Sequence, residues 1–124
     1  MSKTNTVLKA AVVCAAVGMG LLSMTASAKD VVKIAFVGPL TGGVSSIGLG
    51  GRNSADLAVR LRNADPKSKY TYQLVTQDDE CRPNVGVQVA TKVAADKSIV
   101  AGVTHFCSAV AMGTVGVYLS LIHI

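Results

Sequence analysis

The sequence predicts an α/β protein in which helices flank a parallel sheet. Runs of β-branched residues alternate with helical patterns along the chain, in the order β-α-β-α-β-α. The first of these runs is almost continuously apolar, which is typical of a parallel strand that is covered on both faces. The segments between them are short enough for right-handed crossovers between parallel strands. These three observations define the expected fold class.

Residues 1–28 have the pattern of a cleavable secretory signal peptide. Lys3 and Lys9 form a basic start, an uncharged apolar run follows, and an Ala-Ser-Ala cleavage site ends at Ala28. The apolar run is shorter than the roughly 20 residues that span a bilayer. We expect cleavage after Ala28 and an exported mature chain that begins at Lys29.

The first strand is expected at residues 31–37, a β-branched run. Gly and Pro end it, and we expect a Gly/Ser-rich loop through Gly51. Residues 53–63 have a helical pattern, with apolar residues on one face and charged residues on the other. An Asp-Pro pair at residues 65–66 ends this helix.

The second half of the chain repeats this alternation. Residues 70–76 alternate in the manner of a strand, and Pro83 stands where the first turn of a helix tolerates proline. A third strand is expected at residues 99–103, and its apolar run indicates a buried strand. Ser108 then opens a third helical segment, rich in Ala, Val and Gly.

One alternative concerns the end of the chain. From Ile99 to Ile124 the sequence has no Asp, Glu, Lys or Arg, and this length is enough for a membrane helix. Against this, His105, Ser108 and three glycines interrupt the span, and its β-branched beginning favours a strand.

The composition and the motifs limit the functions open to the chain. The formal net charge is +5, aromatic residues make up 4%, and no run of Lys or Arg occurs, so the pattern of a nucleic-acid-binding protein is missing. The glycines near position 50 do not form the dinucleotide fingerprint, because its last position is Asn53. No P-loop and no nucleophile elbow occurs. We expect no cofactor and no nucleic-acid partner.

Cys81 and Cys107 each lie just past the carboxyl end of a predicted strand. In an open α/β sheet, this edge is where ligands bind. In an exported chain, a disulfide between two such thiols is the default expectation. A metal site formed with His105 is the alternative, but the spacing fits no compact zinc pattern, and an oxidised sulfur is no ligand.

Three further features of this edge could carry chemistry. The acidic cluster at residues 78–80 could hold a cation or surround a phospho-acceptor; we interpret it as a solvated loop that caps the next helix or pairs with Arg82. His105 is interpreted as a packed or hydrogen-bonded residue, not as a catalytic base. At Ser108, free N–H groups of a helix start favour an anion such as a carboxylate, although the hydroxyl could equally just cap its own helix.

Four features, in this order and spacing, carry a resemblance to a known family. They are the exported start, the strand and turn at residues 32–42, Asp-Asp-Glu-Cys-Arg-Pro at 78–83, and His-Phe-Cys-Ser at 105–108. Over residues 31–118 the chain resembles the amino-terminal part of a type I periplasmic solute-binding protein of the leucine/isoleucine/valine class.

The resemblance implies several roles. Cys81 and Cys107 match a disulfide of the family, Ser108 matches the residue that holds the ligand carboxylate, and Phe106 and Cys107 would line the same wall. Ile47 stands where members of the class can carry an aromatic residue against the ligand side chain, which leaves the preferred amino acid open. The implied protein binds a small amino acid, first of all a branched-chain one, in the periplasm. It delivers this ligand to an ABC permease of the inner membrane, without catalysis and as a monomer when complete.

The chain also departs from the family pattern. Such proteins have two α/β lobes that close on the ligand, so residues 29–118 correspond to a partial amino-terminal lobe. Residues 119–124 are an apolar tail, which we interpret as a truncation or as foreign sequence. Two other functions stay open: an extracytoplasmic ligand-sensing domain of the same fold, and an exported α/β enzyme that uses His105 or the acidic cluster.

Overall fold

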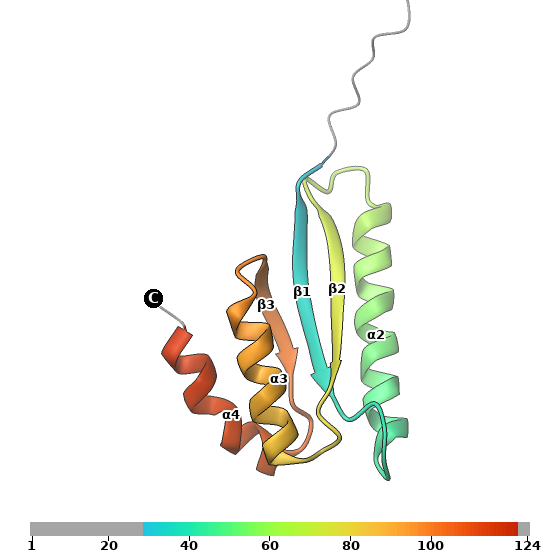
Figure 1. Ribbon diagram of the computed structural model, residues 1–124. Coiled ribbons are helices and arrows are strands. Elements are labelled where there is room, and N and C mark those ends of the chain that lie inside the picture. The colour runs from blue at the N-terminus through green and yellow to red at the C-terminus, as the bar shows by residue number, and fades with distance from the viewer. Residues whose placement is uncertain (1–28, 122–124) are drawn as a thin grey trace, which may run out of the picture.

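The computed structural model describes residues 29–121, so the predicted signal peptide and the end of the predicted tail lie outside the described residues. Within this part, strands and helices alternate along the chain (Figure 1). The strands are β1 (Val31–Gly38), β2 (Thr71–Asp78) and β3 (Ile99–Thr104). The helices are α2 (Ser45–Ala64), α3 (Pro83–Ala95) and α4 (Ser108–Leu121). The predicted α/β class and the order of the elements are confirmed.

The described strands form one parallel sheet in the order β2-β1-β3. The first crossover therefore leads from β1 to β2 at one edge, and the second leads from β2 past β1 to β3 at the other edge. Right-handed crossovers in opposite directions place their helices on opposite faces, and α2 stands on one side of the sheet with α3 and α4 on the other (Figure 1). The loops after β2 and β3 meet beyond the end of β1, at the point where the strand order reverses.

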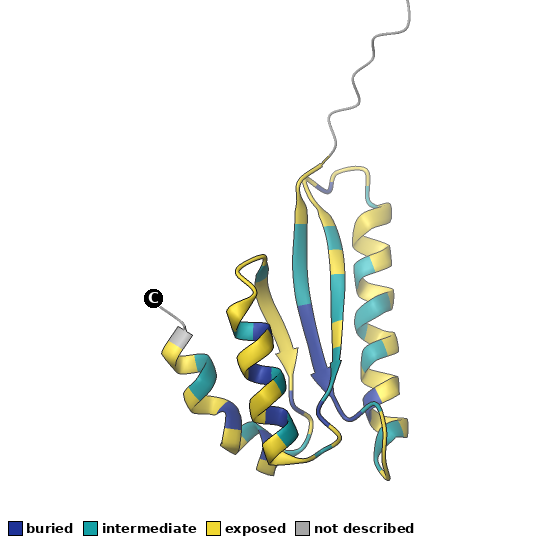
Figure 2. Ribbon diagram, in the orientation of Figure 1, coloured by how far each residue is buried: buried dark blue, intermediate teal, exposed yellow. Residues whose placement is uncertain are grey.

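The core lies at the carboxyl half of the central strand. Ala35 and Val37 are buried on one face of β1 and pack with Val93 of α3. Phe36, between them, points to the opposite face, because side chains alternate along a strand. A Cβ built on Gly51 of α2 would lie 3.2 Å from its ring. Both faces of β1 are thus covered where the strand approaches the carboxyl edge (Figure 2).

Helix α2 corrects the sequence-based prediction. It begins at Ser45, so the loop expected through Gly51 is wrong over most of its length, and the helix is longer than the predicted segment 53–63. The reason is a tertiary contact. A Cβ on Gly48 would collide with the backbone oxygen of Pro39, so the glycine lets the first turns of α2 pack directly against the end of β1.

Strand β3 is a second correction, because it is mostly exposed and not buried as expected. Val100 and Val103 have 67% and 60% of their surface exposed. The strand pairs with β1 on one side, and no other described strand pairs with it. An apolar run does not tell a central strand from one at the edge of a sheet.

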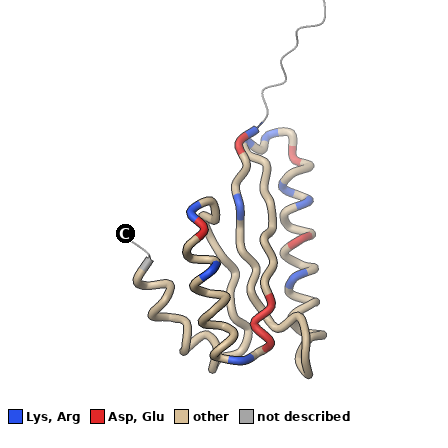
Figure 3. The backbone as a smooth tube through the Cα atoms, viewed as in Figure 1, with Lys and Arg blue, Asp and Glu red and all other residues tan. Residues whose placement is uncertain are grey.

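Charged residues are spread unevenly over the fold. They lie along α2, around the end of β2, in β1 and α3 and in the turns before β2 and β3, whereas β3 and α4 carry none (Figure 3). No helix within residues 29–121 has both the length and the apolar character needed to cross a membrane. The first residues of the predicted tail continue helix α4 as far as Leu121.

Candidate functional site

A groove of about 350 Å³ lies at the carboxyl ends of β1 and β3, on the side of the sheet that α2 covers. Its wall is largely apolar, with Phe36 from β1, Ile47 from α2 and Phe106 from the loop after β3. A larger hollow of about 460 Å³ runs along β3 between α3 and α4, away from this edge. We assign the candidate site to the groove, because ligands of open α/β sheets bind beyond the carboxyl ends of the strands.

The predicted ligand-binding residues fall into two groups in the structure. Ile47 and Phe106 line the groove, and 50% and 59% of their surface is exposed. Cys107 and Ser108 are not among its lining residues. Ser108 is the exposed first residue of α4, two positions after Phe106. The structure therefore brings Ile47 and Phe106 together on the groove wall and places Ser108 outside this wall, at the start of α4.

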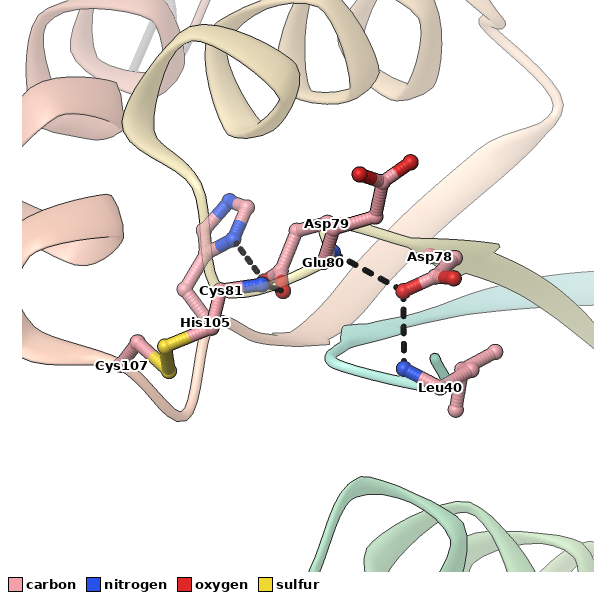
Figure 4. Close-up of a disulfide and its surroundings, with 7 residues drawn as sticks. All are labelled: Leu40, Asp78, Asp79, Glu80, Cys81, His105 and Cys107. Carbon is pink, nitrogen blue, oxygen red and sulfur yellow. Dashed lines mark hydrogen bonds and ion pairs between the residues drawn. A yellow bond between two sulfur atoms is a disulfide. The ribbon is translucent and has the colours of Figure 1, made fainter. Parts of the chain in front are cut away.

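A disulfide joins Cys81 and Cys107, with their Cα atoms 5.6 Å apart. It ties the β2–α3 loop to the β3–α4 loop beyond the end of β1 (Figure 4). Both sulfurs lie at the edge of the sheet that carries the groove, as the position of each cysteine after its strand predicts. Because they are bonded to each other, neither is available as a metal ligand.

Asp78, the last residue of β2, fastens the turn after β1. Its carboxylate accepts hydrogen bonds from the N–H groups of Leu40 and Glu80, at 2.8 and 2.9 Å, and from the Thr41 hydroxyl at 2.6 Å. Burial works to raise the pKa of Asp78, but these hydrogen bonds outweigh it and lower the pKa below its ordinary value. Asp78 is therefore ionised at neutral pH and holds the start of the groove wall in place.

Asp79 does not belong to a solvated loop, and this corrects the interpretation of the acidic cluster. Its side chain is completely buried, and its Oδ2 lies 2.9 Å from Nδ1 of His105, which is itself buried. The other carboxylate oxygen accepts the N–H of Cys81 at 2.9 Å. The expected interpretation holds for Glu80 alone, whose exposed carboxylate pairs with Arg82 at 3.1 Å.

His105 has partners for both ring nitrogens. Nε2 lies 3.0 Å from the hydroxyl of Tyr118 on α4. Burial raises the pKa of the Tyr118 phenol, which keeps its proton. The interpretation of His105 as a packed, hydrogen-bonded residue fits this environment, because its side chain is 2% exposed.

The sequence reading missed this pairing, although a pattern for it exists. Asp79 stands two residues before Cys81, and His105 stands two residues before Cys107. A disulfide between the two cysteines brings their loops together, and the equal spacing then places the carboxylate near the imidazole. Tyr118 could not be found in this way, because its approach depends on how α4 packs.

A parallel α/β unit with an apolar groove at its switch point is the architecture of a ligand-binding lobe. The profile of the periplasmic binding protein family matches residues 31–120, so the chain belongs to this family, and the resemblance seen in the sequence is confirmed. The fold is similar to that of a possible leucine/isoleucine/valine-binding protein from Rhodopirellula baltica SH 1, with a TM-score of 0.63 and 17% identity. This similarity covers 74% of our chain and 25% of the other, so the chain spans a quarter of that protein's length. None of the curated proteins matches the sequence.

Proposed function

We propose that this chain forms part of the first lobe of a periplasmic receptor that binds a small amino acid and delivers it to an ABC permease of the inner membrane. The observation that carries the proposal is the groove at the carboxyl edge of the sheet, with Ile47 and Phe106 on its wall. An apolar wall of this kind suits an aliphatic side chain, so branched-chain amino acids are the leading ligands.

The start of α4 supplies the polar half of the proposed site. Ser108 is exposed and begins the helix. The free N–H groups and the positive end of a helix dipole favour a carboxylate at such a position. The ligand would then lie with its carboxylate toward Ser108 and its side chain toward Phe106.

Binding, not catalysis, is the activity that these residues support. Asp79 and His105, the residues that an exported enzyme would need, are buried and hydrogen-bonded to each other. The groove wall itself offers mainly apolar side chains.

Isothermal titration calorimetry on the complete gene product, with leucine, isoleucine and valine, tests the proposal. We expect binding heats for at least one of the three, and a competition with other amino acids then defines the preference. If no amino acid gives a heat of binding, the proposed function is wrong.

A further inference from the structure

Asp79, His105 and Tyr118 form a continuous hydrogen-bonded chain at the edge of the sheet, and His105 also lines the groove. It connects the loop after β2, the loop after β3 and the body of α4 through contacts of 2.9 and 3.0 Å. The side chains of Asp79 and His105 are 0% and 2% exposed, so water does not compete for the bond between them, whereas the bond to Tyr118 is partly buried. A buried chain of this kind holds its members in one arrangement when every polar atom has a partner.

A direction can be assigned to each hydrogen bond from the donors and acceptors of the three groups. With the Asp79 carboxylate as the acceptor, the proton is assigned to Nδ1 of His105, which donates the hydrogen bond. The Tyr118 hydroxyl is then assigned as the donor to Nε2. This arrangement predicts the Nδ1–H tautomer of His105.

The backbone of His105 shows why such an anchor is needed. Its φ is +54°, in the left-handed region that non-glycine residues rarely adopt. Its N–H donates to the carbonyl of Val37 at 2.8 Å, and its side chain is held by Asp79 and Tyr118. The left-handed residue turns the chain sharply after β3 and directs Phe106 to the groove.

The disulfide alone does not fix this turn. It links the same two loops, two residues beyond Asp79 and two beyond His105. Backbone hydrogen bonds hold each loop on the end of β1, from the Asp79 N–H to Gly38 at 3.1 Å and from the His105 N–H to Val37 at 2.8 Å, but they do not join the two loops to each other. The hydrogen bond between Asp79 and His105 supplies the second link.

We propose that Asp79 and Tyr118, through His105, set the conformation of the β3–α4 loop, and that these three are positioning residues for the ligand groove. The inference rests on the proposed function, because it names the residues that place Phe106 and Ser108 for the ligand. None of the three needs to touch the ligand for this role.

The test uses the full-length protein with leucine as the probe. His105→Ala and Asp79→Ala disrupt the hydrogen-bonded chain, and Tyr118→Phe removes only the bond between Tyr118 and His105. His105→Asn keeps an amide donor near the position of Nδ1. Val93→Ala is the control, because it opens the core behind β1 without touching the loop. For each variant we measure the leucine dissociation constant, the melting temperature, and hydrogen exchange in peptides that cover residues 104–108.

We expect His105→Ala and Asp79→Ala to weaken leucine binding by about 3- to 30-fold, the range for residues that act through a neighbour. Exchange should accelerate in the 104–108 peptides, with a smaller effect in Tyr118→Phe and partial recovery in His105→Asn. Val93→Ala should lower the melting temperature and change neither affinity nor this local exchange.

Two results overturn the inference. One is that Val93→Ala loses as much leucine affinity as His105→Ala for the same fall in melting temperature. The role of the hydrogen-bonded residues would then be merely structural. The other is unchanged affinity or unchanged loop exchange in His105→Ala. If the wild-type protein binds no amino acid, the proposed function fails, and the exchange measurements alone decide whether the chain positions the loop.

Discussion

At the residue scale, Asp78 shows how one carboxylate can organise two segments. It ends β2 and holds the N–H of Leu40 and the hydroxyl of Thr41, both in the turn that leads from β1 into α2. It also accepts the N–H of Glu80, whose φ is +51°. Left-handed backbone at a non-glycine residue costs free energy, and the hydrogen bond to Asp78 offsets part of that cost.

Asp78→Asn should reveal this role through the dependence of stability on pH. The lowered pKa means that Asp78 stabilises the fold when it is ionised, and that this stabilisation is lost as the pH falls below about 4. We expect the variant to lose ~1–2 kcal/mol at pH 7, the typical effect of hydrogen bonds to a charged acceptor. The two proteins should converge toward pH 2.5 in urea denaturation. Asp56→Asn, which breaks an exposed pair with Arg60 on α2, is the control and should show no such convergence.

Ser108 carries the residue-scale prediction for ligand binding. If its hydroxyl and the start of α4 hold the ligand carboxylate, Ser108→Ala in the complete protein should weaken leucine binding by ~1–3 kcal/mol. Ser120→Ala changes the same residue type near the other end of α4, where the hydroxyl bonds the carbonyl of Val117. That control should shift the affinity by less than about 0.5 kcal/mol. Equal affinities in Ser108→Ala and the wild type would remove Ser108 from the site.

What the sequence can reveal at this scale depends on the range of the interaction. The disulfide could be predicted, because each cysteine follows a strand and carboxyl ends of parallel strands share one edge. The burial of Asp79 could not, since a run of three acidic residues is normally solvated. Its partner His105 lies 26 residues away in the sequence. Only the packing of both loops on β1 turns this local acidic pattern into a buried hydrogen-bonded pair.

At the element scale, α2 shows a tertiary contact that overrides helix propensity. Glycines at 48, 50 and 51 predict a loop, because glycine disfavours a helix interior. In the structure Gly48 lies against Pro39 and Gly51 lies near the ring of Phe36. The glycines allow the helix to approach the sheet closely, and this approach brings Ile47 to the groove.

Gly48→Ala and Gly50→Ala form a matched pair that tests this explanation. A Cβ at position 48 would collide with the backbone of Pro39, whereas one at position 50 has nothing within 4 Å. We expect Gly48→Ala to destabilise the protein by ~1–3 kcal/mol through overpacking. Gly50→Ala should stabilise it by up to ~1 kcal/mol, the helix preference of alanine over glycine. Urea denaturation of both variants measures the difference, and equal effects of the same sign would contradict close packing at Gly48.

For the strands, the sequence predicted the positions well but not the burial. Their existence, their order along the chain and their parallel direction followed from β-branched runs and short crossovers, and each lies within two residues of its predicted bounds. The degree of burial did not follow. The central position of β1 and the edge position of β3 depend on which strands pair, and the apolar content of each run is nearly the same.

At the scale of the whole molecule, the disulfide closes a loop that includes α3 and β3. Its two ends are 26 positions apart, and a closure of this length stabilises a fold by ~3.5 kcal/mol in the loop-entropy model. The free energy of unfolding of the double variant Cys81→Ser/Cys107→Ser should therefore be lower by that amount, which shifts its urea midpoint to a lower concentration. Wild-type protein treated with reductant should coincide with it. Two alkylatable thiols in protein purified without reductant would show instead that the bridge does not form.

The last prediction follows from the length of the chain relative to a whole receptor. The groove lies on one edge of one sheet, and the chain spans a quarter of the length of its structural neighbour. In our proposal a second lobe closes over the ligand, excludes water and supplies the remaining contacts.

If a complete receptor binds its amino acid at ~1 µM, the binding free energy is about −8.2 kcal/mol, and half of it corresponds to only ~1 mM. Residues 29–124 alone should accordingly bind leucine at millimolar levels or not measurably, whereas the complete gene product binds far more tightly. Calorimetry on both proteins under identical conditions makes the comparison. Micromolar binding by the short chain would mean that this edge of the sheet is a sufficient site, and that closure by a second lobe contributes little to affinity.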